Sequence, residues 1–178
     1  MERLAQPVEV ASARATRARF LVLLARAALG GVFIYMGLVK VADPVEFLQL
    51  LHQYPAMSGA WVNSVVVILP WLETLCGVAI LLGVVGRAAA IIAVGMLVAF
   101  TPLVAMRGLE IYREAAGTLS ICDVEFDCGC GAGSVALCSK MLENAVLTSL
   151  ALIAIFARSQ FLCLQNLWTD RTAQQAGS

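Results

Sequence analysis

Charged residues are scarce in this chain. Asp, Glu, Lys and Arg make up 13% of its 178 residues, whereas hydrophobic residues make up 61%. A soluble domain typically carries about 25% charged residues. A body this small cannot bury so much apolar surface, so the composition excludes an ordinary soluble domain. Twelve basic and twelve acidic residues leave no net charge, and therefore no basic field that would attract nucleic acid.

Long hydrophobic runs are what the chain has instead. Four runs approach or exceed the roughly 20 apolar residues that a membrane span needs: 20–42, 61–85, 88–106 and 141–157. They predict an all-α membrane protein, a four-transmembrane-helix bundle that occupies residues 20–168. A basic segment (1–19) precedes the bundle, and a tail (169–178) follows it. The first run and its leader are too long for a cleaved signal peptide, so we expect a retained span.

Lys and Arg near the span ends predict the orientation, because they favour the cytoplasmic side. Seven lie on the side of the termini: Arg3, Arg14, Arg17, Arg19, Arg87, Arg158 and Arg171. Four lie on the other side: Lys40, Arg107, Arg113 and Lys140. We therefore expect a multi-pass protein of the bacterial inner membrane with both termini in the cytoplasm. The loops 43–60 and 107–140 then face the periplasm.

A short helix is predicted after the first span. Asp43 at the N-cap, Pro44 at the first helical position and Glu46 three residues after the cap form a helix-start signal. Phe47, Leu48 and Leu51 then share one face, so the helix is expected to lie on the outer membrane interface. It ends before Tyr54-Pro55, since the residue before proline disfavours the α conformation.

The extracytoplasmic loop between the third and fourth spans is rich in cysteine. The third helix is predicted to continue to residue 116, which would hold this loop above the bilayer. Four of the six cysteines lie within it: Cys122, Cys128, Cys130 and Cys138. Thiols outside the cytoplasm tend to oxidise. Cys128-Gly129-Cys130 can close only a small, strained ring, and such disulfides are the easily reduced ones.

Three interpretations of these cysteines remain open. Cys128 and Cys130 are the exchanging pair of a redox relay, with Cys122 and Cys138 as resolving or structural residues. Alternatively, all four form structural disulfides, whose connectivity the sequence does not choose. A metal site of four thiolates is the third, but the spacing C-x5-C-x-C-x7-C is unusual for zinc or iron–sulfur clusters, so no metal is expected. Acidic neighbours such as Asp127 disfavour a free thiolate, which indicates a resting disulfide attacked by a partner's thiolate.

Two charges lie inside the apolar runs. Arg26 and Glu73 each cost about 2.5–3.5 kcal/mol in a bilayer. Their Cα depths differ by about 7 Å, which an arginine side chain can span, so we predict an ion pair. The pair is either a clamp between helices or a polar site for a quinone head group or a proton. Lys40, near the outer end of the first span, either pairs with Glu143 or extends to the lipid head groups.

Several short motifs resemble the DoxX/MauE group of small four-helix membrane proteins. They are Gly37-x-x-Lys40, Asp43-Pro44, Leu69-Pro70-Trp71-Leu72-Glu73 and Asp127-Cys128-Gly129-Cys130-Gly131. The last is similar to the outer loop of the methylamine-utilisation protein E branch. The resemblance covers roughly residues 20–157.

The resemblance implies a redox-active accessory of thiol–disulfide chemistry that helps to mature a periplasmic enzyme. Its expected partners are the lipid bilayer and a thioredoxin-like periplasmic protein. Related DoxX-type proteins are membrane subunits of thiosulfate:quinone oxidoreductase, so a quinone is the candidate cofactor. The alternative is a non-catalytic subunit or anchor of a larger respiratory or photosynthetic membrane complex, in which the cysteines only staple a docking loop.

Overall fold

The structure is a computed structural model that describes residues 6–54, 57, 59–83, 86–115, 120–129 and 133–156. Within these residues the chain is mostly helical. Its elements are α1 (Gln6–Ala42), α2 (Pro44–His52), α3 (Trp61–Leu82), α4 (Gly86–Glu114), a 3-10 turn η2 (Ile121–Asp123), β1 (Glu125–Asp127), β2 (Ser134–Ala136) and α5 (Leu137–Phe156).

Among the described residues, four helices are long and apolar enough to cross a membrane, which fits a multi-pass membrane protein. These segments are Phe20–Ala42 within α1 and the whole of α3, α4 and α5. The second span ends at Leu82 rather than at residue 85, because Gly83 adopts a left-handed conformation that terminates α3. The fourth span begins at Leu137 rather than at residue 141. The apolar run in the sequence starts only after Lys140, because a charged residue interrupts it, but the helix itself includes Lys140. The predicted end of the third helix, residue 116, lies outside the described residues.

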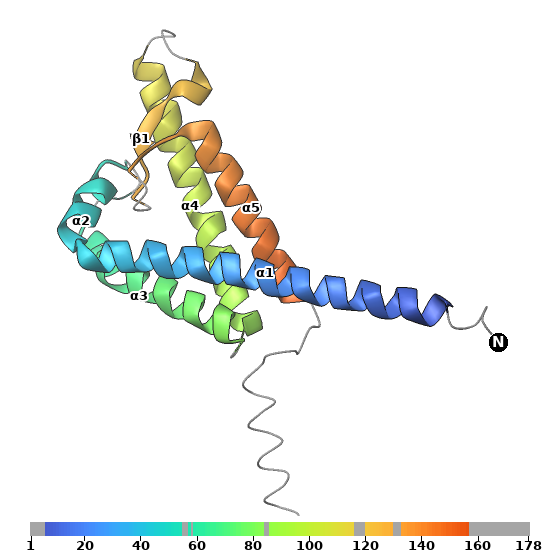
Figure 1. Ribbon diagram of the computed structural model, residues 1–178. Coiled ribbons are helices and arrows are strands. Elements are labelled where there is room, and N and C mark those ends of the chain that lie inside the picture. The colour runs from blue at the N-terminus through green and yellow to red at the C-terminus, as the bar shows by residue number, and fades with distance from the viewer. Residues whose placement is uncertain are drawn as a thin grey trace, which may run out of the picture.

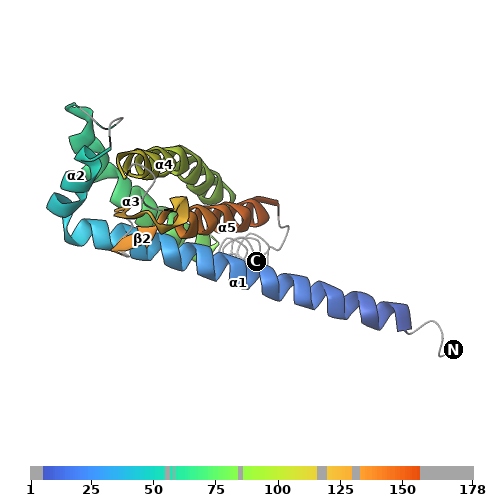
Figure 2. The ribbon, with the colours of Figure 1, turned by 90° about the horizontal axis from the view of Figure 1, so that it is seen from above.

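The long helices form two antiparallel pairs, α1 with α3 and α4 with α5 (Figure 1). The view from above shows α2 and the strands gathered at one end of the molecule, here called the hairpin end (Figure 2). Glycines bring α1 and α3 into backbone contact. A Cβ built on Gly77 would lie 2.7 Å from the Gly30 carbonyl oxygen, so a larger residue would push the helices apart.

The predicted short helix is present as α2, and its N-cap is as expected. The Glu46 amide donates to Asp43 Oδ1 over 2.9 Å, and Pro44 is the first helical residue. Its apolar face does not merely rest on a membrane interface, however. Phe47 and Leu51 are buried in a cluster with α3 residues such as Val66, because that helix offers a protein surface to the same side chains.

The segment between α4 and α5 contains a two-stranded antiparallel hairpin that the sequence pattern does not predict. Phe126 of β1 pairs with Val135 of β2. Val124 and Phe126 are buried against Val104 of α4 and Leu137 of α5. Strands of three residues are too short to show an alternating pattern. The hairpin therefore owes its place to these apolar contacts with the helices.

Candidate functional site

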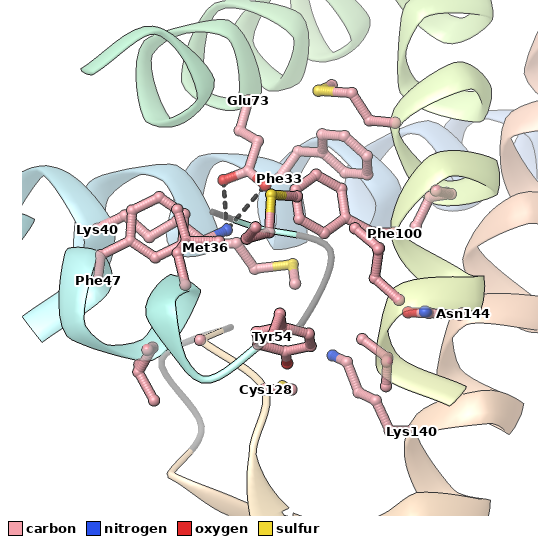
Figure 3. A pocket seen from close by; sticks show the side chains of 18 residues that line it. Phe33, Met36, Lys40, Phe47, Tyr54, Glu73, Phe100, Cys128, Lys140 and Asn144 are labelled. Atoms are coloured by element: carbon pink, nitrogen blue, oxygen red, sulfur yellow. Dashed lines mark hydrogen bonds and ion pairs between the residues drawn. The ribbon is translucent and has the colours of Figure 1, made fainter. Parts of the chain in front are cut away.

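A cavity lies at the hairpin end, where α1, α2, α3, α4, α5 and the turn after β1 meet (Figure 3). Its volume is about 60 Å³. Aromatic and methionine side chains make up much of the wall: Phe33, Met36, Phe47, Met57, Met96 and Phe100.

A buried ion pair forms one side of this cavity. Lys40 Nζ donates to both carboxylate oxygens of Glu73, over 2.8 Å and 2.6 Å. The two side chains are only 7% and 10% exposed. Side chains of an α-helix lean toward its N-terminus. Because α1 and α3 are antiparallel, Lys40 and Glu73 lean toward each other and meet although they start from different depths.

The predicted pair of Arg26 with Glu73 is wrong. Both oxygens of the Glu73 carboxylate are bound by Lys40. Arg26 instead lies against Gly86 at the start of α4, where a Cβ would be 2.6 Å from Arg26 Nη2. Cα depth alone does not determine the partner of Glu73, because the side chains lean along the helix axis. Arg26 leans toward the N-terminus of α1, and therefore away from Glu73.

A second lysine lies on the opposite side of the cavity. Lys140 is 3% exposed, and its Nζ donates to Glu143 Oε2 over 3.0 Å. The alternative pairing of Lys40 with Glu143 is therefore not formed. The neighbouring Asn144 is also buried and donates through Nδ2 to Thr101 Oγ1 over 3.1 Å. The signal for this group is the spacing of Lys140 and Glu143, three residues apart at the start of an apolar helix.

Tyr54 brings a phenol into the cavity between α2 and α3. It is 7% exposed, and its hydroxyl finds no hydrogen-bond partner among the residues that the structure describes. Burial raises the pKa of the Tyr54 phenol to about 12, an effect that nearby Asp127 reinforces and Arg107 opposes. The hydroxyl therefore keeps its proton at neutral pH and is available as a donor. In the sequence Tyr54 marks only the end of a helix, so its place in a cavity is not predictable from it.

The structure divides the loop cysteines into two groups. Cys122 and Cys138 form a disulfide that joins η2 to the first turn of α5, on either side of the hairpin. This bond excludes a metal site made of all four thiolates. Cys128 is also disulfide-bonded, and it lines the cavity. Cys130 lies outside the described residues.

The turn that follows β1 rests on α2. Gly129 has a φ of +70°, and its amide donates to Asp127 Oδ1 over 2.8 Å. A Cβ built on Gly129 would be 3.6 Å from the ring of Phe47, so the backbone packs closely on that ring. Gly129 therefore lies beside α2 at the cavity. Cys128 lies next to Tyr54 (Figure 3).

The cavity thus brings together three of the predicted site residues, Lys40, Glu73 and Cys128. A model of the methylamine utilisation protein MauE family matches residues 18–157, which include every residue that lines it. The chain belongs to the MauE family. This confirms the MauE part of the predicted resemblance; the DoxX part remains a resemblance only. No match to a curated protein or to a solved structure accompanies the family match.

Proposed function

We propose that this MauE-family protein exchanges disulfides with a thioredoxin-like protein on the periplasmic side of the bacterial inner membrane. The exchange serves the maturation of a periplasmic enzyme in methylamine utilisation. Cys128 and Cys130 are the exchanging pair. Cys122 and Cys138 staple the base of the hairpin and do not exchange.

The observation that carries this proposal is the disulfide of Cys128. The Cys122–Cys138 bond accounts for two cysteines, and Cys76 is a buried free thiol in α3. Cys128 is bonded and therefore has a partner beyond the described residues. Cys130 is the neighbour that we assign to it, because Gly129 between them has the positive φ that a tight ring requires.

The exchange reaction is balanced as follows. A thiolate of the partner attacks one sulfur of the Cys128–Cys130 disulfide, whose S–S bond breaks as a mixed disulfide forms. The second thiol of the partner then attacks the mixed disulfide and releases the partner in its oxidised form. Two electrons pass from the partner to Cys128 and Cys130, which become thiols. Cys128, the cysteine of this pair that the structure describes, is partly exposed.

The distribution of charged residues supports a periplasmic site. The hairpin end carries the acidic side chains of Asp123, Glu125 and Asp127, and the basic residues outside the spans favour the other side. A disulfide at this end would then be exposed to an oxidising compartment.

Cysteine-to-serine variants of the full-length chain test the proposal in cells. A partner variant that lacks its second thiol should accumulate as a mixed disulfide with the wild-type chain, because nothing on the partner then releases it. Cys128→Ser should abolish both this trapping and the maturation of the target enzyme. Cys76→Ser is the matched control, since that thiol is buried in α3, and it should have no effect. Normal maturation with Cys128→Ser, at wild-type protein levels, would contradict the exchange role and favour a non-catalytic membrane subunit.

A further inference from the structure

Two hydrogen-bond donors lie near Cys128 at the cavity, the Tyr54 hydroxyl and the Lys140 ammonium group (Figure 3). We propose that the Tyr54 hydroxyl donates a hydrogen bond to the thiolate of Cys128 when its disulfide opens, and that Lys140 stabilises the same negative charge. This inference rests on the proposed exchange function. It adds which sulfur carries the charge during exchange and which side chains hold that charge.

The Tyr54 hydroxyl is a donor without an acceptor among the described residues. The side chain is more than nine-tenths buried, and its oxygen atom is itself buried. A buried donor without a partner costs free energy, so it needs an explanation. Because solvent does not reach the oxygen, the acceptor must come from the protein. Figure 3 shows Cys128 next to the hydroxyl, and its sulfur is therefore the acceptor that we assign.

The oxidation state of Cys128 decides whether this hydrogen bond forms. Cys128 is disulfide-bonded in the structure, and a neutral sulfur is a weak acceptor. A thiolate carries a full negative charge, and hydrogen bonds to ionised groups are about twice as strong as neutral ones. The donating proton stays in place, since burial raises the pKa of Tyr54 to about 12. The hydroxyl is thus unsatisfied in the disulfide form and satisfied in the thiolate form.

Lys140 supplies a buried positive charge to the same part of the cavity. Its side chain is 3% exposed, whereas that of its partner Glu143 is 44% exposed. Water screens the charge of Glu143 more strongly than that of the buried lysine. Lys140 Nζ also has three protons and gives one of them to Glu143. Since a neighbouring cation lowers the pKa of a thiol, Lys140 favours the thiolate of Cys128.

The other charged groups around the cavity are engaged with partners. Two ion pairs account for four of them, Lys40 with Glu73 and Arg107 with Glu110. Asp127 is the carboxylate that opposes a thiolate on the neighbouring residue. Its Oδ1 accepts a hydrogen bond from the Gly129 amide, which stabilises its charge. Asp127 therefore acts against the thiolate, while Lys140 and Tyr54 act for it.

The exchange step then has a defined leaving group. The thiolate of the partner protein attacks the sulfur that is bonded to Cys128. The S–S bond breaks, a mixed disulfide forms on the attacked sulfur, and the electron pair of the broken bond stays on Cys128 as a thiolate. A thiol of lower pKa leaves faster. Tyr54 and Lys140 should therefore speed the opening of the disulfide.

The test measures the pKa of the Cys128 thiol in isolation. The full-length chain carries three serine substitutions, Cys76→Ser, Cys130→Ser and Cys163→Ser. With the Cys122–Cys138 disulfide formed, Cys128 is then the one thiol left, and the result does not depend on the position of Cys130. The protein is placed in lipid nanodiscs, and the rate of alkylation by iodoacetamide is followed as a function of pH.

We expect the midpoint of this profile to lie below the ordinary pKa of cysteine, about 8.5. Tyr54→Phe should raise the midpoint by about one pH unit, a tenfold smaller thiolate fraction at neutral pH, without lowering the melting temperature. Lys140→Met should raise it as well. Tyr112→Phe and Arg113→Met are the matched controls, because they remove the same groups from α4 outside the cavity, and neither should move the midpoint.

The outcomes separate this inference from the proposed function. If Tyr54→Phe and Lys140→Met leave the midpoint unchanged, the thiolate assignment is wrong, whatever happens to the maturation of the target enzyme. Equal shifts in the control variants would also overturn it, since the effect would not come from the cavity. If the midpoint rises as expected but Cys128→Ser cells mature the enzyme normally, the thiolate site stands and the exchange function is wrong.

Discussion

The buried pair of Lys40 and Glu73 allows a quantitative prediction about the stability of the bundle. Opposite charges 2.6 Å apart attract by about 6 kcal/mol at an effective dielectric constant of about 20. The cost of removing both ions from water offsets most of that attraction. Removing one partner leaves the other buried without compensation, which costs about 3–5 kcal/mol. Lys40→Met and Glu73→Gln should each destabilise the protein by about that amount.

The double variant should cost no more than either single one, because it leaves no unpaired charge. The coupling free energy between the two positions is then about 3 kcal/mol, at the upper end of values for contacting residues. It can be measured by thermal or detergent-induced unfolding of the full-length protein, followed by circular dichroism. Arg26→Met, alone and combined with Glu73→Gln, is the control, because Arg26 lies against Gly86.

Two results would refute the reasoning. If the effects of Lys40→Met and Glu73→Gln add to within about 0.5 kcal/mol, the two side chains do not form the pair. If Arg26→Met couples with Glu73→Gln instead, the depth argument from the sequence is right and the lean of the side chains does not decide the partner.

Three further predictions concern the hairpin, the helix contact and the phenol. Loss of the Cys122–Cys138 disulfide, which closes a 16-residue separation, should lower the stability of the hairpin by about 3 kcal/mol in amide hydrogen exchange; unchanged protection would contradict its role as a staple. Gly77→Ala should destabilise the bundle by about 1–3 kcal/mol, while Gly95→Ala, with nothing within 4 Å of its Cβ position, should not; equal melting temperatures would contradict close packing. Tyr54 should ionise near pH 12, and stability should fall as the pH rises from 10 to 12, because the folded state then holds the proton that the unfolded state loses. Ultraviolet difference titration should show this late phase, and its persistence in Tyr54→Phe would assign it elsewhere.

The membrane helices were predictable because hydropathy depends on composition alone. Four apolar runs can avoid water only in lipid or by packing against one another. The helices α1, α3, α4 and α5 contain those runs. The start of α2 was equally predictable, since Asp43 and Pro44 act on the backbone within four residues. Local signals of this kind do not depend on how the helices pack.

The contents of the site were only partly predictable, because they depend on the packing of distant elements. Lys40, Glu73 and Cys128 are conspicuous in the sequence as charges in apolar runs and as a cysteine in a Cys-Gly-Cys motif. The way in which these residues come together is not predictable from the sequence, since Lys40 was expected near Glu143 or the lipid head groups. Tyr54 marks only the end of a helix in the sequence. Its place in the cavity, with a buried hydroxyl that has no partner among the described residues, is visible only in the structure.

A continuous set of contacts links the disulfide to the membrane helices. Gly129, next to Cys128, packs on the ring of Phe47. Lys40 Nζ lies 5.4 Å from the centre of that same ring, within the range of a cation–π interaction. Lys40 in turn is bound to Glu73, on the neighbouring helix α3. The ion pair therefore does more than join α1 to α3. It also holds the Phe47 ring on which the turn after β1 packs, and this turn places Cys128 at the edge of the cavity.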